Sequence, residues 1–129
     1  MMLKSMLALS LIALSLPAFA GDPTAGAQVF KKCLACHAVG EDAKNKVGPV
    51  LNGLFGRPAG SVPGYDYSDA NKNSGIVWTP EVFAEYIKNP RAYIKGTKMA
   101  FAGLKKDKEI EDITAYLAQF NADGTMNAP

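Results

Sequence analysis

Apolar positions recur every three or four residues near both ends of the chain, which is the spacing of amphipathic helices. The first helix is predicted from Asp22, which can cap it, to Ala38, with Pro23 in its first turn. Its apolar positions are Gly26, Val29, Phe30 and Leu34. The last helix is predicted from Asp107 to about Phe120. Its single apolar stripe consists of Ile110, Ile113, Tyr116, Leu117 and Phe120.

Three shorter helical segments are predicted before the last helix. Ser68 can cap a segment that runs through Asn73, with Gly75 just beyond it. Thr79 and Pro80 can start another that stops at Asn89, and Asn89-Pro90 starts a brief turn that Gly96 ends. The strict alternation of apolar and polar residues expected of strands is not found. The predicted fold class is therefore all-α, with a single small domain.

The stretch from Gly40 to Gly75 is rich in glycine and proline, which breaks the helical spacing. A long irregular segment inside a small domain is uncommon unless it is disordered or wraps around something. Its apolar and aromatic side chains argue against disorder. They are Leu51, Leu54, Phe55, Tyr65, Tyr67, Ile76, Val77 and Trp78, the last three just past Gly75. Large aliphatic side chains are scarce after residue 20, so another group is expected to fill the centre.

The first twenty residues differ from the rest of the chain. Lys4 precedes an apolar run from Met6 to Leu16, and then come Pro17 and the small-residue pattern Ala18-Phe19-Ala20. This order is typical of a secretory signal peptide, and we expect cleavage after Ala20. A membrane anchor is the alternative, but the run is much shorter than the roughly 20 residues that span a bilayer. The expected domains are residues 1–20, removed on export to the periplasm, and residues 21–129, soluble and without a membrane span.

The charge excludes one broad class of function. The chain has 14 basic and 12 acidic residues and a formal net charge of +2. Loss of Lys4 with the leader lowers this charge to +1. Such a small excess disfavours a general polyanion binder, so no nucleic-acid partner is expected.

The most specific motif is Cys33-Leu34-Ala35-Cys36-His37, which has the spacing of covalent haem attachment. Two thiols three residues apart can add to the two vinyl groups of one haem, and the adjacent imidazole can reach its iron. A disulfide between Cys33 and Cys36 is an alternative, although so short a loop removes little entropy from the unfolded chain. A thioredoxin-like dithiol normally follows a strand, and a zinc site normally has four ligands. Cys33, Cys36 and His37 are the only Cys and His residues in the chain.

The second axial ligand of the iron can be sought by elimination. His37 is the only histidine, so two histidines cannot ligate the iron within one chain. Outside the leader the methionines are Met99 and Met126, and Met126 is expected to fray because it lies near the end. Met99 lies in a loop between two predicted helices, where its thioether could face an iron. The alternative is that Met99 only fills the core, as most methionines do.

With these residues in view, the chain resembles the class I cytochromes c, and among them the bacterial cytochrome c2 group. The resemblance runs from Gly21 to Phe120. Besides the haem motif it rests on Gly48-Pro49, Leu51 to Arg57, Tyr65-Asp66-Tyr67, Ala70 to Asn73, Trp78, Glu85-Tyr86, Asn89-Pro90, Lys95 to Met99 and Ala115-Tyr116-Leu117. It implies helices and long loops wrapped around one covalently bound haem c, with His37 and Met99 as axial iron ligands.

The resemblance also implies roles around the cofactor. Pro49 would offer its carbonyl to the second ring nitrogen of His37. Tyr86 would direct its hydroxyl to the sulfur of Met99. The other expected members of the haem surroundings are Asn71 and Thr97, in the polar network of Tyr86, and Arg57, Tyr67 and Trp78, beside a propionate. The first and last helices would cross at Gly26 and Phe30 on one side, and at Ile113 and Tyr116 on the other.

A closed His/Met-ligated iron implies an electron carrier and not an enzyme, cycling between Fe(III) and Fe(II). By resemblance, a monomeric carrier would take electrons from a bc-type complex and pass them to a photosynthetic reaction centre or a terminal oxidase. A lysine-rich face around the haem edge would dock these membrane complexes. Its members are Lys95, Lys98, Lys105, Lys106 and Lys108, with Lys31, Lys32 and Lys46 if the family fold holds.

Two other functions stay open at this stage. An easily displaced Met99 would leave an open iron, as in a gas sensor or a weak peroxidase, although no second histidine is present to assist peroxide cleavage. A ligand switch is also possible, in which Lys98 or Lys95 replaces Met99 at high pH.

Overall fold

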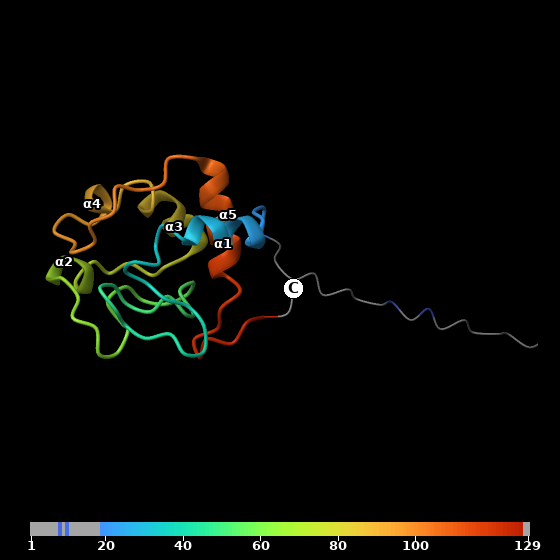
Figure 1. Ribbon diagram of the computed structural model, residues 1–129, viewed down its shortest axis with the longest axis horizontal. Coiled ribbons are helices and arrows are strands. Elements are labelled where there is room, and N and C mark those ends of the chain that lie inside the picture. Colours follow the sequence, from blue (N-terminus) through green and yellow to red (C-terminus); the bar gives the residue numbers. More distant parts are fainter. Residues whose placement is uncertain (1–7, 9, 11–18, 128–129) are drawn as a thin grey trace, which may run out of the picture.

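The computed structural model describes residues 8, 10 and 19–127, and most of the expected leader lies outside the described residues. Its helices are α1 (Pro23–Phe30), α2 (Asp69–Lys72), α3 (Pro80–Tyr86), α4 (Pro90–Tyr93) and α5 (Asp107–Leu117). Long loops join them and form much of the lower half of Figure 1. In this described part the only extended pairings are isolated bridges, Pro58 with Val77 and Phe120 with Met126. The all-α prediction is confirmed.

The predicted capping residues start their helices. The side chain of Asp22 accepts a hydrogen bond from the backbone N–H of Thr24, and Ser68 accepts one from Asn71. The other two caps act in the same way: Thr79 at α3 and Asn89 at α4. Proline follows directly in α3 and α4, at a position where the missing N–H has no helical partner.

The predicted first helix is too long. Helix α1 ends at Phe30, and the chain continues in tight turns, with the Cys33 N–H donating to Phe30 O at 2.8 Å and the Cys36 N–H to Cys33 O at 3.1 Å. Leu34, which suggested a longer apolar stripe, is 48% exposed. Helices α3 and α5 also end earlier than predicted, at Tyr86 and Leu117.

Helices α1 and α5 cross in close contact, as predicted (Figure 1). A Cβ atom at Gly26 would lie 2.0 Å from the carbonyl oxygen of Asp112, so only glycine allows this approach. The rings of Phe30 and Tyr116 pack beside it with centroids 5.4 Å apart. The buried Asp112 carboxylate accepts hydrogen bonds from Lys108 Nζ and from the backbone N–H of Asp22, and these bonds lower its pKa. The crossing thus fixes the start of α1 on α5.

The end of the chain is ordered further than predicted. Met126 was expected to fray, but its backbone pairs with Phe120, and the Asn127 N–H donates to Gln119 O at 2.8 Å. Its side chain is 56% exposed and lies outside the central cavity. Met126 is therefore not an alternative to Met99 as a candidate iron ligand. Among the described residues, no helix is both long and apolar enough to cross a membrane.

Candidate functional site

A cavity of about 310 Å³ lies at the centre of the fold, between the loops and helices α3 and α5. The structure brings every candidate site residue to its wall: Cys33, Cys36, His37, Pro49, Arg57, Tyr67, Asn71, Trp78, Tyr86, Thr97 and Met99. Apolar side chains from distant parts of the chain complete the wall, among them Leu54, Phe83, Phe101, Ile113 and Leu117. The scarce aliphatic residues thus surround a central space instead of filling it.

His37 is held in one orientation by the loop that follows it. Its ring Nδ1 lies 2.7 Å from the carbonyl oxygen of Pro49, and because a carbonyl can only accept, Nδ1 carries the proton. Burial lowers the pKa of His37, so the neutral ring leaves its Nε2 lone pair free as a metal ligand. The residue is only 8% exposed.

Gly48 forms part of the same support. A Cβ atom at this position would lie 2.4 Å from Cε1 of His37 and 2.8 Å from each ring nitrogen. The Gly48 N–H donates to Cys36 O at 2.8 Å, which fixes the backbone next to the ring. Sequence reasoning did not assign Gly48 a role, although Gly48-Pro49 was among the blocks of resemblance.

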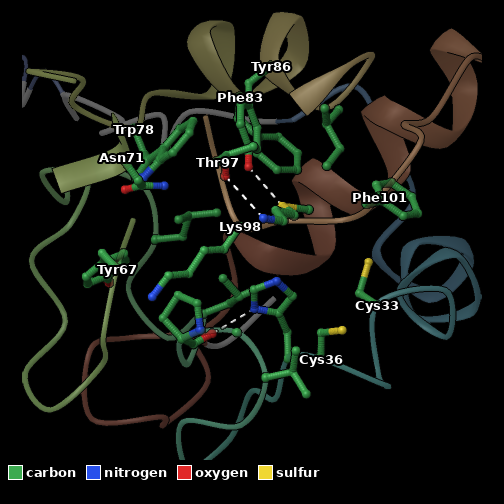
Figure 2. Close-up of a pocket in the computed structure, with 18 of the residues that line it drawn as sticks. Cys33, Cys36, Tyr67, Asn71, Trp78, Phe83, Tyr86, Thr97, Lys98 and Phe101 are labelled. Carbon is green, nitrogen blue, oxygen red and sulfur yellow. Dashed lines mark hydrogen bonds between the residues drawn. The ribbon is translucent and has the colours of Figure 1, made fainter. Parts of the chain in front are cut away.

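Met99 is held from the other side of the cavity. The hydroxyl of Tyr86 donates to its sulfur, with 2.9 Å between the atoms, and its backbone N–H donates to Thr97 Oγ1 at 3.2 Å; dashed lines mark these bonds in Figure 2. Burial raises the pKa of Tyr86 to about 12, so its hydroxyl stays a donor at neutral pH. The expected pairing of Tyr86 with Met99 is present in the structure.

Asn71 was expected in the same polar network. It lies on the cavity wall, but its buried Oδ1 has no hydrogen-bond partner among the described residues. A buried acceptor without a partner costs free energy, so this oxygen indicates that a donor is missing from the cavity. Its bond to the network of Tyr86 stays a prediction.

Arg57, Tyr67 and Trp78 lie where they could bind an acidic group of a ligand. Arg57 Nη1 donates to the carbonyls of Val50 and Asn52, at 3.0 and 3.1 Å, and in the described part of the chain it forms no ion pair. Burial lowers the pKa of its guanidinium, which favours an anion beside it. Tyr67, Asn71 and Trp78 lie together on one side of the cavity in Figure 2.

The two cysteines lie on the opposite side (Figure 2). Both are free thiols, so the short disulfide is not formed. Burial raises the pKa of Cys33 to about 11, which keeps its thiol protonated at neutral pH. A dithiol enzyme needs a thiolate nucleophile of lowered pKa, so this environment argues against that alternative. In the residues that the structure describes, no three His, Cys, Asp or Glu side chains cluster closely enough to hold a metal ion.

The residues that line the cavity fit a haem. The apolar cavity offers an imidazole nitrogen and a thioether as iron ligands, which suit iron in this cofactor. Two thiols border one side, and the Arg57 guanidinium, which forms no ion pair with the described residues, lines the wall elsewhere. The Oδ1 atom of Asn71, which has no partner among the described residues, is available to accept a hydrogen bond from a polar group.

The lysines expected around the haem edge are all exposed. Lys32 and Lys98 also border the cavity. The Lys98 ammonium donates to the backbone carbonyl of Asp66 at 2.8 Å and pairs with its carboxylate at 3.2 Å. Lys32 pairs with Glu109 at 3.0 Å. The replacement of Met99 by Lys98 or Lys95 at high pH stays a prediction.

Proteins of similar sequence and structure are known. The family model described as "Cytochrome c" matches residues 23–121. The chain is 63% identical over 109 residues to "Cytochrome c2" of Blastochloris viridis, covering 84% of this chain and 86% of the relative. It is 58% identical over 108 residues to "Cytochrome c-550" of Nitrobacter winogradskyi, covering 84% and 99%. The solved structure of cytochrome c2 from Rhodospirillum centenum superposes with a TM-score of 0.75 at 43% identity, over 78% of this chain and 99% of that one.

Proposed function

The chain belongs to the cytochrome c family, and on this premise we propose that His37 and Met99 are the two axial ligands of its covalently bound haem c. Members of this family are electron carriers and not enzymes. The haem supplies one-electron exchange between Fe(III) and Fe(II) when bound.

One observation carries the proposal: the imidazole and the thioether face the same cavity, and each is fixed from behind by a hydrogen bond. Pro49 holds Nδ1 of His37 at 2.7 Å, and Tyr86 holds the sulfur of Met99 at 2.9 Å. Such partners orient a ligand and tune how strongly it donates electrons. Two ligands held in this way leave no open position for a substrate, which favours electron transfer over the chemistry of a gas sensor or a peroxidase.

Buried apolar side chains surround the site. Phe83, Ile113 and Leu117 are each at most 5% exposed, and they come from helices that pack against each other. A wall that moves little and admits little water needs little rearrangement when the charge of the site changes. Arg57 and the partnerless oxygen of Asn71 are placed to compensate polar groups of the cofactor.

Replacement of Met99 by alanine tests the proposed ligand set. The mature haem-loaded protein is expected to be low-spin, to show a far-red Met-to-iron absorption band, and to ignore carbon monoxide. Met99→Ala should lose that band and bind carbon monoxide in the ferrous form, because the thioether that closes the iron is gone. Met126→Ala, which changes an exposed side chain outside the cavity, is the control. A wild-type protein that is high-spin and responds to carbon monoxide would contradict the proposal and favour a sensor or an enzyme.

The hydroxyl of Tyr86 is expected to raise the reduction potential. A donor bonded to the sulfur withdraws electron density from it, and this density would otherwise stabilise Fe(III). Tyr86→Phe should therefore lower the potential while the protein stays low-spin. A net hydrogen bond is worth about 1 kcal/mol, so the one-electron shift should stay below about 59 mV, the equivalent of a tenfold change. Redox titration measures it, and an unchanged or higher potential would contradict this role.

The exposed lysines support a proposal about partners and place of action. We infer a soluble, monomeric periplasmic carrier, exported by cleavage after Ala20, which accepts electrons from a bc-type complex. Its acceptor would be a photosynthetic reaction centre or a terminal oxidase. Lys32 and Lys98 border the cavity directly, and the other lysines of the proposed face are exposed. A positive face near the cofactor would attract acidic surfaces even though the net charge is close to zero.

Association with such a partner is expected to slow steeply as ionic strength rises. Long-range attraction between exposed charges is screened over about 10 Å at 0.1 M salt. The second-order rate of electron transfer to the purified partner, measured by stopped flow at several salt concentrations, checks this. Lys106→Gln should reduce the slope, whereas Lys44→Gln, outside the proposed face, should leave it unchanged. A rate independent of salt would contradict docking by charge.

A further inference from the structure

The C-terminal tail consists of residues 121–127, and all but the first of these lie beyond the residues that the family model matches. It forms a closed turn. The Asn121 N–H donates to Thr125 O at 2.8 Å, and the carboxylate of Asp123 accepts bonds from both the N–H and the hydroxyl of Thr125. The Asn127 N–H then donates back to Gln119 O, two residues after the end of α5. These hydrogen bonds hold the tail in one conformation.

This turn packs against both ends of the proximal loop, residues 40–53. Gly124 is buried, and a Cβ atom there would lie 2.2 Å from Gly40 O and 2.7 Å from Glu41 Cα. At the other end of the loop, a Cβ atom at Gly53 would lie 2.8 Å from Cα of Ala122. Figure 1 shows the red tail passing beside this loop. The backbone of the tail therefore lies in close contact with the backbone of the loop at both ends.

The two ends of the proximal loop are also tied to each other. The buried Asn52 side chain donates to Gly40 O at 2.8 Å and accepts from the Gly40 N–H at 2.9 Å. The Gly53 N–H donates to Phe120 O at 3.0 Å, where the tail begins. The tail, the two loop ends and the residues just after α5 therefore form one hydrogen-bonded unit.

Pro49, the residue whose carbonyl holds His37, lies in this same loop, three positions before Asn52. Arg57 joins that stretch to the unit, since its Nη1 donates to Val50 O and Asn52 O. A shift of the loop ends would therefore move the Pro49 carbonyl relative to Nδ1 of His37. Hydrogen bonds weaken quickly with distance and misalignment, so a small shift would matter.

We propose that the tail is a positioning segment, which holds the proximal loop so that the Pro49 carbonyl stays on His37. The inference rests on the proposed function, in which His37 is an iron ligand. A strong Nδ1–H bond to Pro49 makes the imidazole a better electron donor and stabilises Fe(III). Loosening the tail should therefore weaken this bond and raise the reduction potential, although no residue of the tail lines the cavity.

Gly124→Ala and Thr125→Val test the proposal in the haem-loaded protein. Gly124→Ala introduces a methyl group 2.2 Å from Gly40 O, and Thr125→Val is milder because it removes only the hydroxyl bonds. Gly75→Ala is the matched control: Gly75 also has a positive φ, of 70° against 85° for Gly124, but a Cβ there meets nothing within 4 Å. It therefore carries the same backbone strain without a contact.

Two measurements distinguish a positioning role of the tail from an effect on general stability. Exchange of the His37 Nδ1 proton, followed by NMR, should speed up about fivefold in Gly124→Ala relative to Gly75→Ala, as expected for loss of one hydrogen bond. The reduction potential should rise, with Thr125→Val between Gly124→Ala and the control. If exchange and potential in both tail variants equal those of the control, the proposal is overturned. The proposed axial ligands are tested separately, by the far-red band of the unmodified protein. The ligand proposal and the tail proposal can therefore fail independently.

Discussion

Replacement of both Cys33 and Cys36 by alanine is expected to leave no haem attached after acid–acetone extraction, and no haem stain on a denaturing gel. Both residues are free thiols beside the cavity, on one turn of the chain and on the same side of the site. A thiol adds across a vinyl group with its hydrogen going to the vinyl carbon, so each cysteine accounts for one thioether bond. Either single variant should therefore keep the cofactor by one bond.

The same double variant is also expected to lose its folded structure. A cavity of about 310 Å³, at about 24 cal/mol for each Å³ left unfilled, corresponds to about 7 kcal/mol. The net stability of a small domain is about 5–15 kcal/mol, so this loss is large enough to unfold it. The cofactor would act as the missing part of the core.

Circular dichroism and thermal melting of the double variant, expressed with the haem-attachment machinery, measure this loss. Leu34→Ala is the control, because Leu34 lies between the two cysteines and is 48% exposed. It should mature and melt as the unmodified protein does. A double variant that keeps its helices and melts normally would show that the apolar wall folds without a covalent cofactor.

Local patterns predicted most of the helices correctly. Asp22, Ser68, Thr79 and Asn89 cap helices as expected, because capping depends on the residue and its immediate neighbours. The end of α1 was missed because Leu34 continues the apolar spacing and yet points to the surface. Periodicity alone cannot tell a buried leucine from an exposed one. The ordered tail was missed for a similar reason, since its partners, Gly40 and Gly53, are far away in the sequence.

The candidate site residues that line the cavity could be named from the sequence because short motifs contain most of them. The Cys33 to His37 motif is read from spacing alone, and the roles of Pro49 and Tyr86 came from resemblance to a family. Gly48 was not assigned a role, since only the folded chain brings its Cα against the ring of His37. The unpartnered Oδ1 of Asn71 is likewise a property of the packed cavity. The pattern of residue types does not predict contacts between distant segments of the chain.

Gly48→Ala is expected to have an effect almost as large as loss of the thiols. The added methyl carbon would lie 2.4 Å from Cε1 of His37, far inside van der Waals contact, and the obstacle is the face of a ring instead of a flexible chain end. The ring is also held by Pro49 O on Nδ1, and the Gly48 backbone is held by Cys36 O. Relief therefore requires breaking one of these bonds and tilting the imidazole away from its position.

The strain acts only through this contact, because φ of Gly48 is not among the positive values found at other glycines. We expect a sharply reduced yield of haem-loaded protein, and a high-spin fraction in the protein that does mature, since a tilted imidazole is a weaker iron ligand. Visible spectra and haem stain at equal expression measure both. Gly64→Ala, in a loop where the nearest atom to the added methyl would be 3.9 Å away, should mature normally in spite of its positive φ of 78°. A fully low-spin Gly48→Ala protein at normal yield would mean that the proximal loop can move, and would equally weaken the role given to the tail.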